Sequence, residues 1–222
     1  MTGDAGRSSP GFDSAVATGK GDDGTTGLLF GGDRISKDDP RAEAYGTIDE
    51  AVAALGLARA ELALKQQYGV VPPALAGLAE VILRLQRELF VAAAELATTP
   101  SAWDRLEDDR TRVSAAMVAG LDELLREVET HVEMPTEFVV PGESRTSAAI
   151  ELARTVLRRA ERRSVALSRA ELVPGPHLLP YLNRLADLLW VLARAAEQAE
   201  SRRAPPSRPG RRQKTGTRSE EG

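Results

Sequence analysis

The chain carries the stretch ARTVLRRAERRSVAL at residues 153–167 and a companion stretch, PYLNRLADLLWVLAR, at residues 180–194. Each stretch repeats apolar residues at the spacing that places them on one face of a helix. These residues are Leu152, Val156, Ala160 and Leu167 for the first stretch and Leu185, Leu189 and Leu192 for the second. The pattern predicts two amphipathic helices joined by a turn, LVPGPH, at residues 172–177.

Each predicted helix also carries a row of polar side chains. Residues at i, i+4, i+7 and i+8 share one side of a helix. The row is Arg154, Arg158, Glu161 and Arg162 on the first helix and Asn183, Asp187, Trp190 and Arg194 on the second. Facing rows would gather guanidinium, carboxylate and amide groups over an apolar floor, which suits a polyanion. The alternative is a solvated face held by weak i,i+4 ion pairs.

Helical patterns continue towards the N-terminus. Asp39 and Pro40 are typical of a cap and a first helical residue, and predict a helix that ends near residue 64. Two prolines at 72 and 73 predict a second helix to about residue 97, and a third is expected over residues 110–133. Ser144 is a candidate cap of the arginine-rich helix. The sequence therefore predicts an all-α fold, an up-and-down bundle of five helices.

Composition limits the classes of protein. The 222 residues are 42% hydrophobic and 4% aromatic, which favours one helical domain with a sizeable core. Cysteine is absent, so the chain has no disulfide, thiolate metal site or cysteine nucleophile, as is compatible with a cytoplasmic protein. The net charge is −4, yet residues 202–222 hold seven basic residues and two acidic ones. The remainder of the chain is therefore clearly acidic, and we expect no nucleic-acid partner. No signal peptide and no apolar run long enough to cross a membrane is visible.

The predicted organisation has three parts. Residues 1–18 form a flexible lead-in, residues 19–200 the bundle domain, and residues 201–222 a disordered basic tail. The domain opens with a flexible glycine-rich segment, GKGDDGTTGLLFGGDRISKDD, at residues 19–39. Glycines let backbone amides approach phosphates, while Thr25, Thr26 and Lys37 add hydroxyl groups and a cation. A plain flexible loop explains the same composition.

A second segment outside the helices is EFVVPGESRTS at residues 137–147, which leads into the arginine-rich helix. Its aromatic residue, Phe138, fits either of two positions. It could pack in the core, or it could project beside the arginine row as the flat wall of a cavity.

Three segments in order resemble the PduO-type ATP:cob(I)alamin adenosyltransferases, which are trimeric helical bundles. They are GDDGTTGLLFGGDRISKDDPRAEAYGTIDEAVAALGLARA, FVVPGESRTSAAIELARTVLRRAERRSVAL and LLPYLNRLADLLWVLAR. The resemblance covers about residues 21–198. It implies that Co(I) of a reduced corrinoid attacks the 5′ carbon of ATP, forming a cobalt–carbon bond and expelling tripolyphosphate. The cobalt supplies the nucleophile, so the protein supplies positioning and charge stabilisation.

The resemblance also implies roles for individual residues. The ATP-wrapping segment would use Lys20, Gly21, Asp22, Gly24, Thr25, Thr26 and Lys37. The two polar rows would hold the nucleotide through Arg158, Glu161, Arg162 and Asn183. Asp49 would pair with Arg154 across a subunit boundary at the edge of the corrinoid pocket, and Phe138 would lie against the lower face of the corrin. Arg158, Asn183 and Phe138 are then the residues expected to act in catalysis, and no residue is identified as a metal ligand.

Charge considerations favour a cationic partner for Asp49, since burying an unpaired carboxylate among Ile48, Val52 and Leu55 would be costly.

Some positions depart from the family pattern. Lys20 replaces a threonine, and Glu143 replaces the second glycine of a Pro-Gly-Gly turn, where its charge could alter the corrinoid pocket. Ala51 and Ala186 replace a leucine and a serine.

The resemblance implies Mg²⁺ as cofactor, ATP and cob(I)alamin as substrates, and a homotrimer with active sites between subunits. Possible partners are an electron-donating reductase and a B12-dependent mutase. Two alternatives stay open from the residues alone: a noncatalytic corrinoid or nucleotide binding module that has lost turnover through changes such as Glu143, and a purely structural bundle with solvated arginine rows.

Overall fold

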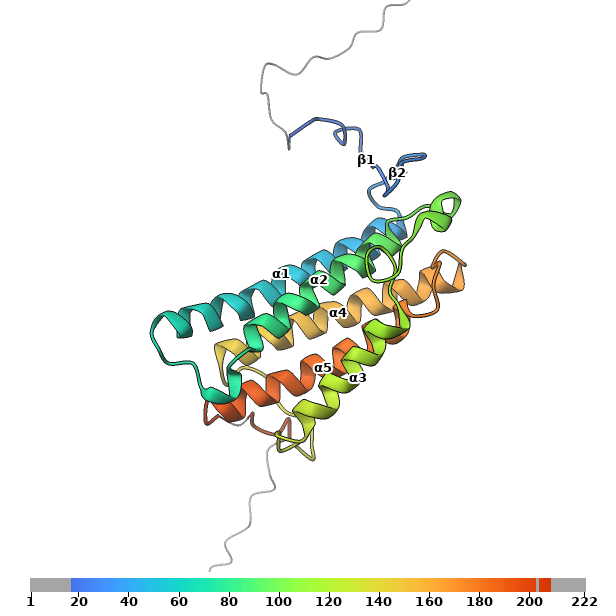
Figure 1. Cartoon of the computed structure of the whole chain (residues 1–222). Helices are drawn as coiled ribbons and strands as arrows, with labels where there is room; N and C mark the ends of the chain where they lie inside the picture. Colours follow the sequence, from blue (N-terminus) through green and yellow to red (C-terminus); the bar gives the residue numbers. More distant parts are fainter. Residues whose placement is uncertain (1–16, 203, 209–222) are drawn as a thin grey trace, which may run out of the picture.

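The computed structural model describes residues 17–202 and 204–208, and the predicted all-α bundle is confirmed (Figure 1). The long helices are α1 (Pro40–Gln67), α2 (Leu78–Leu96), α3 (Ala115–Glu129), α4 (Arg145–Arg169) and α5 (Leu178–Ala199). The predictions for most of the lead-in, residues 1–16, and for most of the basic tail, residues 209–222, lie outside the described residues.

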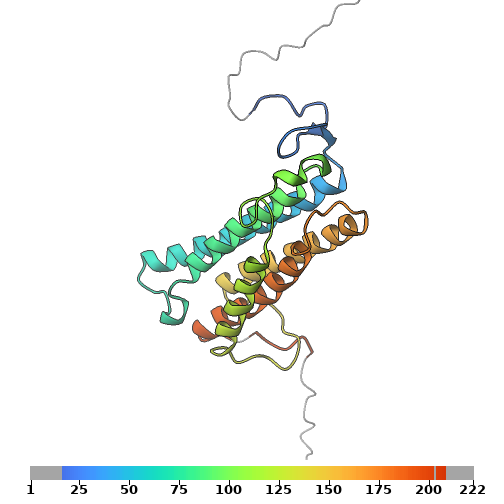
Figure 2. The same cartoon turned by 45° about the vertical axis from the view of Figure 1, so that its right-hand side comes forward.

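The helices pack in two layers. Helices α1 and α2 form one layer, α4 and α5 the other, and α3 lies against α5 (Figure 2). Helix α1 also packs along α4 in an antiparallel direction. Lys65 near the end of α1 donates to Thr146 at the start of α4, whereas Arg163 near the end of α4 reaches Glu43 at the start of α1. The first and fourth helices are therefore neighbours, although the paired residues are 81 and 120 positions apart in sequence.

The predicted helix starts are confirmed where a side chain caps the first turn. Asp39 accepts from the amide of Arg41 at 2.8 Å, with Pro40 as the first helical residue. Ser144 accepts from the amide of Ser147 at 3.1 Å. Both side chains satisfy amides that have no partner within the helix, which explains why the sequence marks these ends well.

Two predicted boundaries are wrong. The prolines at 72 and 73 lead into a short 3₁₀ turn, η1 (Pro73–Leu75), and α2 starts only after Gly77, which has a φ of 84°. The third helix starts at Ala115 rather than at residue 110, after a second 3₁₀ segment, η2 (Pro100–Arg105), and a loop. Ser114 caps it by accepting from the amide of Met117.

The core lies between the two layers. Leu85 and Leu89 of α2, Ala160 of α4 and Leu185 of α5 are completely buried, as their helical spacing predicts. Leu152 is an exception: 49% of it is exposed, so it is not part of the buried stripe of α4. The described structure contains no helix that is both long enough and apolar enough to cross a membrane.

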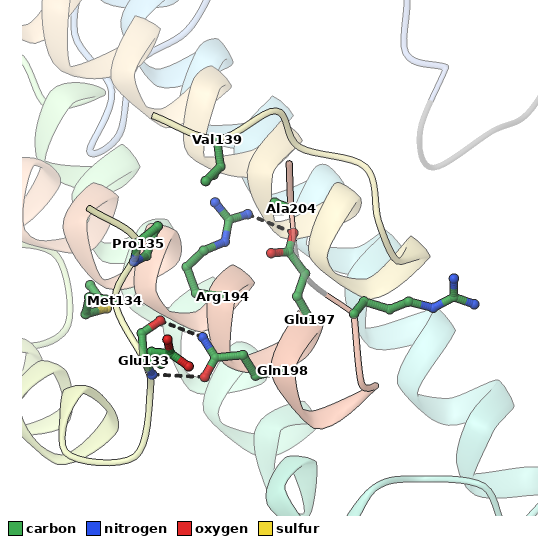
Figure 3. A pocket seen from close by; sticks show the side chains of 9 residues that line it. Glu133, Met134, Pro135, Val139, Arg194, Glu197, Gln198 and Ala204 are labelled. Carbon is green, nitrogen blue, oxygen red and sulfur yellow. Dashed lines mark hydrogen bonds and ion pairs between the residues drawn. The ribbon is translucent and has the colours of Figure 1, made fainter. Parts of the chain in front are cut away.

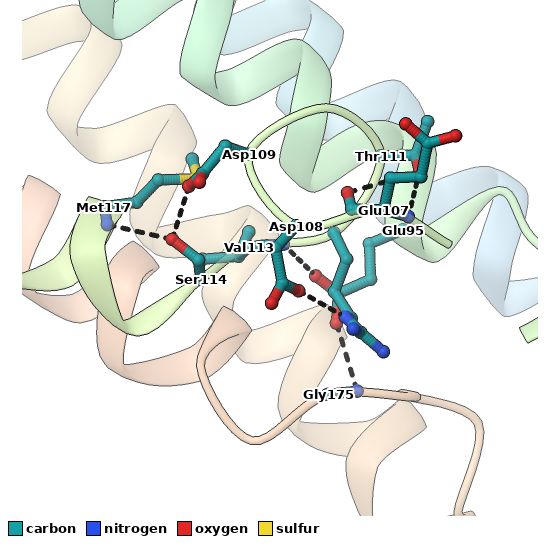
Figure 4. Close-up of polar contacts among 10 residues, drawn as sticks. Glu95, Glu107, Asp108, Asp109, Thr111, Val113, Ser114, Met117 and Gly175 are labelled. Carbon is teal, nitrogen blue, oxygen red and sulfur yellow. Dashed lines mark hydrogen bonds and ion pairs between the residues drawn. The ribbon is translucent and has the colours of Figure 1, made fainter. Parts of the chain in front are cut away.

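A buried carboxylate joins three segments at one end of the bundle (Figure 4). Glu95 of α2 accepts from the amide of Val113 at 2.8 Å and from the amide of Gly175, in the α4–α5 turn, at 3.1 Å. Burial raises the pKa of Glu95, and the two amide hydrogen bonds oppose that shift. These contacts hold the loop that precedes α3, and so the helix starts at Ala115 rather than at residue 110. The periodicity of the sequence does not reveal them.

Candidate functional site

The arginines of α4 divide into two groups that face different directions. Arg159 forms an ion pair with Glu50, and Arg163 with Glu43, so both face α1. Arg163 also donates to the hydroxyl group of Thr47. These ion pairs connect two packed helices, and we assign them to the stability of the fold.

The predicted polar row lies on the other side of α4. Arg158 and Arg162 are exposed, and among the described residues neither guanidinium has a carboxylate partner. Arg162 donates to the main-chain carbonyl of Arg158 at 3.0 Å. Both are exposed, as the alternative interpretation of a solvated face expects, but among the described residues neither forms an i,i+4 ion pair within the row. Their positive charge is available to an anion.

The two polar rows meet at Asn183 and Glu161. The side-chain amide of Asn183 donates to the carboxylate of Glu161 at 3.2 Å, across the α4–α5 interface. Asn183 is both exposed to solvent and hydrogen-bonded, so its amide does not pay the cost of unpaired burial. Because Glu161 lies one turn beyond Arg158, the bond brings α5 to the edge of the arginine row.

A cavity of about 720 Å³ lies beside the row. Phe138, from the loop between α3 and α4, lines it together with Arg154 and Arg158 of α4 and Trp190 of α5. The side chain of Phe138 is 86% exposed, so this residue is not part of the core. Of the two positions that the sequence allows for Phe138, the structure shows the cavity wall.

Arg154 belongs to a cluster of charges that extends beneath the cavity. Its guanidinium donates to Glu151 at 2.7 Å, and Glu151 also pairs with Arg194 of α5 at 3.2 Å. Arg194 pairs in turn with Glu197 at 2.9 Å (Figure 3). Glu151, Arg194 and Glu197 are each at most 3% exposed, and burial raises the pKa of Glu197, against the effect of Arg194.

Sequence reasoning missed the two glutamates of this cluster. It placed Arg194 at the end of a polar row, but did not identify an anion for it. The available signal was spacing: Glu151 precedes Arg154 by three residues, and Glu197 follows Arg194 by three, which brings each pair together on one helix face.

Asp49 differs from expectation. It is exposed on α1 rather than buried, and within the chain it does not pair with Arg154, whose partner is Glu151. Its neighbours Ile48 and Val52 are buried in the core, whereas Asp49 lies beyond the edge of that buried face. A pair between Asp49 of one subunit and Arg154 of another stays a prediction.

The glycine-rich segment is folded back on itself. Strands β1 (Thr25–Thr26) and β2 (Ile35–Ser36) form a small antiparallel ladder. Arg34 closes it by donating to the hydroxyl of Thr25 at 2.6 Å and to the carbonyl of Lys20 at 2.7 Å. The expected flexible loop thus contains a hairpin, and the sequence signal was Arg34 beyond the Gly-Gly turn.

Lys37 connects the two ends of this segment. Its ammonium group donates to the carbonyl of Gly21 at 2.8 Å. A Cβ atom added to Gly21 would lie 3.0 Å from the Lys37 nitrogen and 3.2 Å from the carbonyl oxygen of Thr25, so a larger residue would displace the Lys37 ammonium group by a few tenths of an ångström. Gly24 has a φ of 80°, in the region that favours glycine. The predicted ATP-wrapping residues Lys20, Gly21, Asp22, Gly24, Thr25, Thr26 and Lys37 therefore lie in one compact turn and hairpin.

This segment is attached to the end of α2 rather than to the arginine row. Leu29 donates to the carbonyl of Ala97 at 2.8 Å, and the guanidinium of Arg105 lies 4.3 Å from the ring centre of Phe30. Within the described part of the chain, no hydrogen bond or ion pair joins residues 19–39 to α4. The structure therefore brings the two polar rows and Phe138 to one region, and leaves the glycine-rich segment apart from them within a single chain.

Sequence comparison identifies relatives over most of the chain. A family described as cobalamin adenosyltransferase matches residues 16–196. A corrinoid adenosyltransferase of Citrobacter freundii is 37% identical over 182 residues, which are 82% of this chain and 94% of that protein. The corrinoid adenosyltransferase PduO of the same organism is also 37% identical, and there the match covers 50% of the relative.

Comparison of structures gives a similar result. A variant of the PduO-type ATP:corrinoid adenosyltransferase from Lactobacillus reuteri, complexed with cobalamin and ATP, superposes with a TM-score of 0.72. The identity is 26%, and the match covers 86% of this chain and 98% of the other.

Proposed function

Because this chain belongs to the cobalamin adenosyltransferase family, we propose that its polar rows and the cavity below Phe138 together form the site at which ATP adenosylates a corrinoid. Cobalt of the Co(I) substrate attacks the 5′ carbon of ATP. The cobalt–carbon bond forms as the bond from that carbon to the triphosphate oxygen breaks, and tripolyphosphate leaves with the bonding electrons. No proton is transferred in this step, so no general base is needed.

The observation that carries the assignment is the position, next to a large cavity, of two cations that have no carboxylate partner among the described residues. Arg158 lines the cavity, and Arg162 lies one turn further along α4. One turn of helix is about 5.4 Å, so the two guanidiniums can contact successive groups of a triphosphate that leaves the cavity along α4. Charge that grows on the leaving oxygen would be stabilised by Arg158, and Asn183 with Glu161 would position the nucleoside.

Phe138 would contact the corrinoid. An exposed aromatic ring at the rim of the cavity offers a flat apolar surface to one face of a macrocycle. With a corrinoid bound, the ring would exclude a lower axial ligand from the cobalt. A cobalt without that ligand is easier to reduce to Co(I), which is the state that the reaction uses.

Mg²⁺ fits this site as a companion of ATP rather than as a resident ion. The described residues contain no group of three or more acidic or histidine side chains that could hold a metal by themselves. Mg²⁺ usually combines one or two carboxylates with substrate phosphates and water. Glu161 and the amide oxygen of Asn183 lie next to the arginine row and could supply such oxygen ligands. When bound, the ion would neutralise charge on the triphosphate.

A homotrimer with sites between subunits accounts for the separation of the glycine-rich segment from the row. Residues 19–39 are held by α2 and η2 of their own chain, away from α4. Asp49 is exposed and unpaired with Arg154 in its own chain, so it is available to Arg154 of a neighbouring copy. We further propose a cytoplasmic enzyme that receives electrons from a reductase and delivers its product to a B12-dependent mutase.

An anaerobic adenosylation assay tests the site. Purified protein with ATP, Mg²⁺ and chemically reduced cobalamin should form a light-sensitive alkylcobalamin, followed by absorbance. Arg158→Ala should lower the rate by about 100-fold, because removal of one charge-stabilising group typically has that effect. Asn183→Ala should also lower it. Arg159→Ala is the matched control, since Arg159 lies on the same helix but pairs with α1. Equal rates for Arg158→Ala and Arg159→Ala would refute the assignment.

A further inference from the structure

The chain beyond the family match returns to the loop that carries Phe138. The match ends at residue 196, and α5 ends at Ala199. Ser201 has a φ of 56°, and the amides of Ser201 and Arg202 donate back to the carbonyls of Gln198 and Glu197 at 3.0 and 2.7 Å. This pair of hydrogen bonds around a left-handed residue is a helix-ending motif that reverses the chain direction.

After the reversal, residues 204–208 form a short strap along the loop that carries Phe138. The amide of Ser207 donates to the carbonyl of Phe138 at 2.7 Å, and the amide of Val140 donates to the carbonyl of Pro205 at 2.8 Å. Val139 and Pro206 lie opposite each other as an antiparallel pair between these two bonds. Pro206 has no amide hydrogen, but its position in the pair does not require one.

The strap matters because core packing does not hold the ring of Phe138, which is 86% exposed. The main chain on both sides of Val139 is instead tied to the strap. Gln198 of α5 adds a second attachment to the same loop: its side-chain amide accepts from the amide of Glu133 and donates to the carbonyl of Glu133, at 2.9 and 2.7 Å (Figure 3). The loop is thus anchored at two points, one on α5 and one on residues 204–208.

We propose that residues 204–208 are a positioning segment for the reaction: they hold the Phe138 loop at the rim of the cavity, so that the ring meets the corrinoid without rearrangement. The proposal rests on the proposed function of Phe138. It assigns a role to a part of the chain that lies outside the matched family residues. Pro205 and Pro206 suit the role, because fixed φ angles reduce the entropy that an extended strap loses on pairing.

The test is a pair of substitutions at one position in the full-length protein. Ser207→Pro removes the amide hydrogen that binds the carbonyl of Phe138, whereas Ser207→Ala keeps it. Ser207 is exposed, so neither change should disturb the core. Hydrogen exchange measured by NMR should show faster exchange of the Val140 amide in Ser207→Pro by about 2- to 10-fold, the range expected for loss of one hydrogen bond in this ladder. Ser207→Ala should match the wild type.

The catalytic part uses the same proteins with Phe138→Ala as a second background. Ser207→Pro should lower kcat for adenosylation by about 2- to 10-fold with the KM for ATP unchanged, and should have no further effect once Phe138 is alanine. Unchanged Val140 exchange in Ser207→Pro, or an equal effect of Ser207→Pro with and without Phe138, would overturn the proposal. If the wild-type protein formed no alkylcobalamin, the proposed function would fail, and the exchange experiment would still decide whether the strap holds the loop.

Discussion

Replacement of Arg194 by methionine should destabilise the fold strongly, and by an amount that depends on pH. Arg194 is 2% exposed and lies 3.2 Å from Glu151 and 2.9 Å from Glu197, both of which are buried. Two unit charges about 4 Å apart interact by about 4 kcal/mol at an effective dielectric constant of about 20. Removal of the cation leaves two buried carboxylates without it, and such losses typically cost about 3 to 5 kcal/mol. We expect a decrease of that size in the free energy of unfolding at pH 7.5.

The pH dependence follows from Glu197. Burial raises its pKa above the usual value, so the folded state binds a proton more readily than the unfolded state does. A carboxyl group with a raised folded pKa favours folding below its unfolded pKa, and this contribution is lost as the pH rises through the folded pKa. In Arg194→Met the pKa of Glu197 should rise further, because the cation that lowers it is gone. The difference between Arg194→Met and wild type should therefore narrow as the pH falls from 7.5 towards about 5.

Urea unfolding at both pH values, at one fixed protein concentration, measures these differences. Arg159→Met is the matched control, because it breaks a partly exposed pair and should cost no more than about 1 kcal/mol at either pH. The triple variant that combines Arg194→Met with Glu151→Gln and Glu197→Gln should recover part of the lost stability, since the three buried side chains are then neutral. A loss below about 1 kcal/mol, or one that is independent of pH, would contradict the argument about buried charge.

Three further predictions concern single positions. Gly21→Ala should raise the KM for ATP several-fold, because its Cβ would lie 3.0 Å from the Lys37 nitrogen, and should leave the melting temperature unchanged, because the turn is exposed. An unchanged KM would mean that this turn does not take part in ATP binding. Gly175→Ala should lower the free energy of unfolding by about 1 to 3 kcal/mol in urea, because its Cβ would lie 2.7 Å from the buried carboxylate of Glu95, and an unaffected midpoint would show that the turn adapts. Glu143→Gly should change the adenosylation rate by less than about 3-fold, since Glu143 is exposed and does not line the cavity, and a larger gain in single-turnover assays would mean that its charge reaches the site.

The sequence predicts the bundle because its strongest signals are local. Apolar spacing and the caps at Asp39 and Ser144 locate α1 and α4 within a few residues, and they depend only on neighbours in the chain. The start of α3 is missed because the preceding loop is held by Glu95, a residue far away in sequence whose contacts periodicity does not contain. The hairpin in the glycine-rich segment is missed for a similar reason, as it depends on Arg34 folding back onto Thr25.

The candidate site is predicted in part. Spacing alone places Arg158 and Glu161 on one face of α4, and the contact of Glu161 with Asn183 follows from two facing amphipathic helices. Spacing does not show that Asp49 points away from the core, because a helix that packs on two neighbours has a wide apolar face with uncertain edges. Nor does it reveal that residues 204–208 return to the Phe138 loop, which requires a chain reversal after the last helix.

The division of the α4 arginines into two faces has a consequence for inherited or engineered variants. Arg159 and Arg163 connect helices, whereas Arg158 and Arg162 have no such role within the described chain. Substitutions at Arg158 or Arg162 should yield protein that accumulates to normal amounts in a cell and escapes proteolysis, but that has lost most of its adenosylation activity. Abundance measured in such cells would therefore not report on whether the enzyme works.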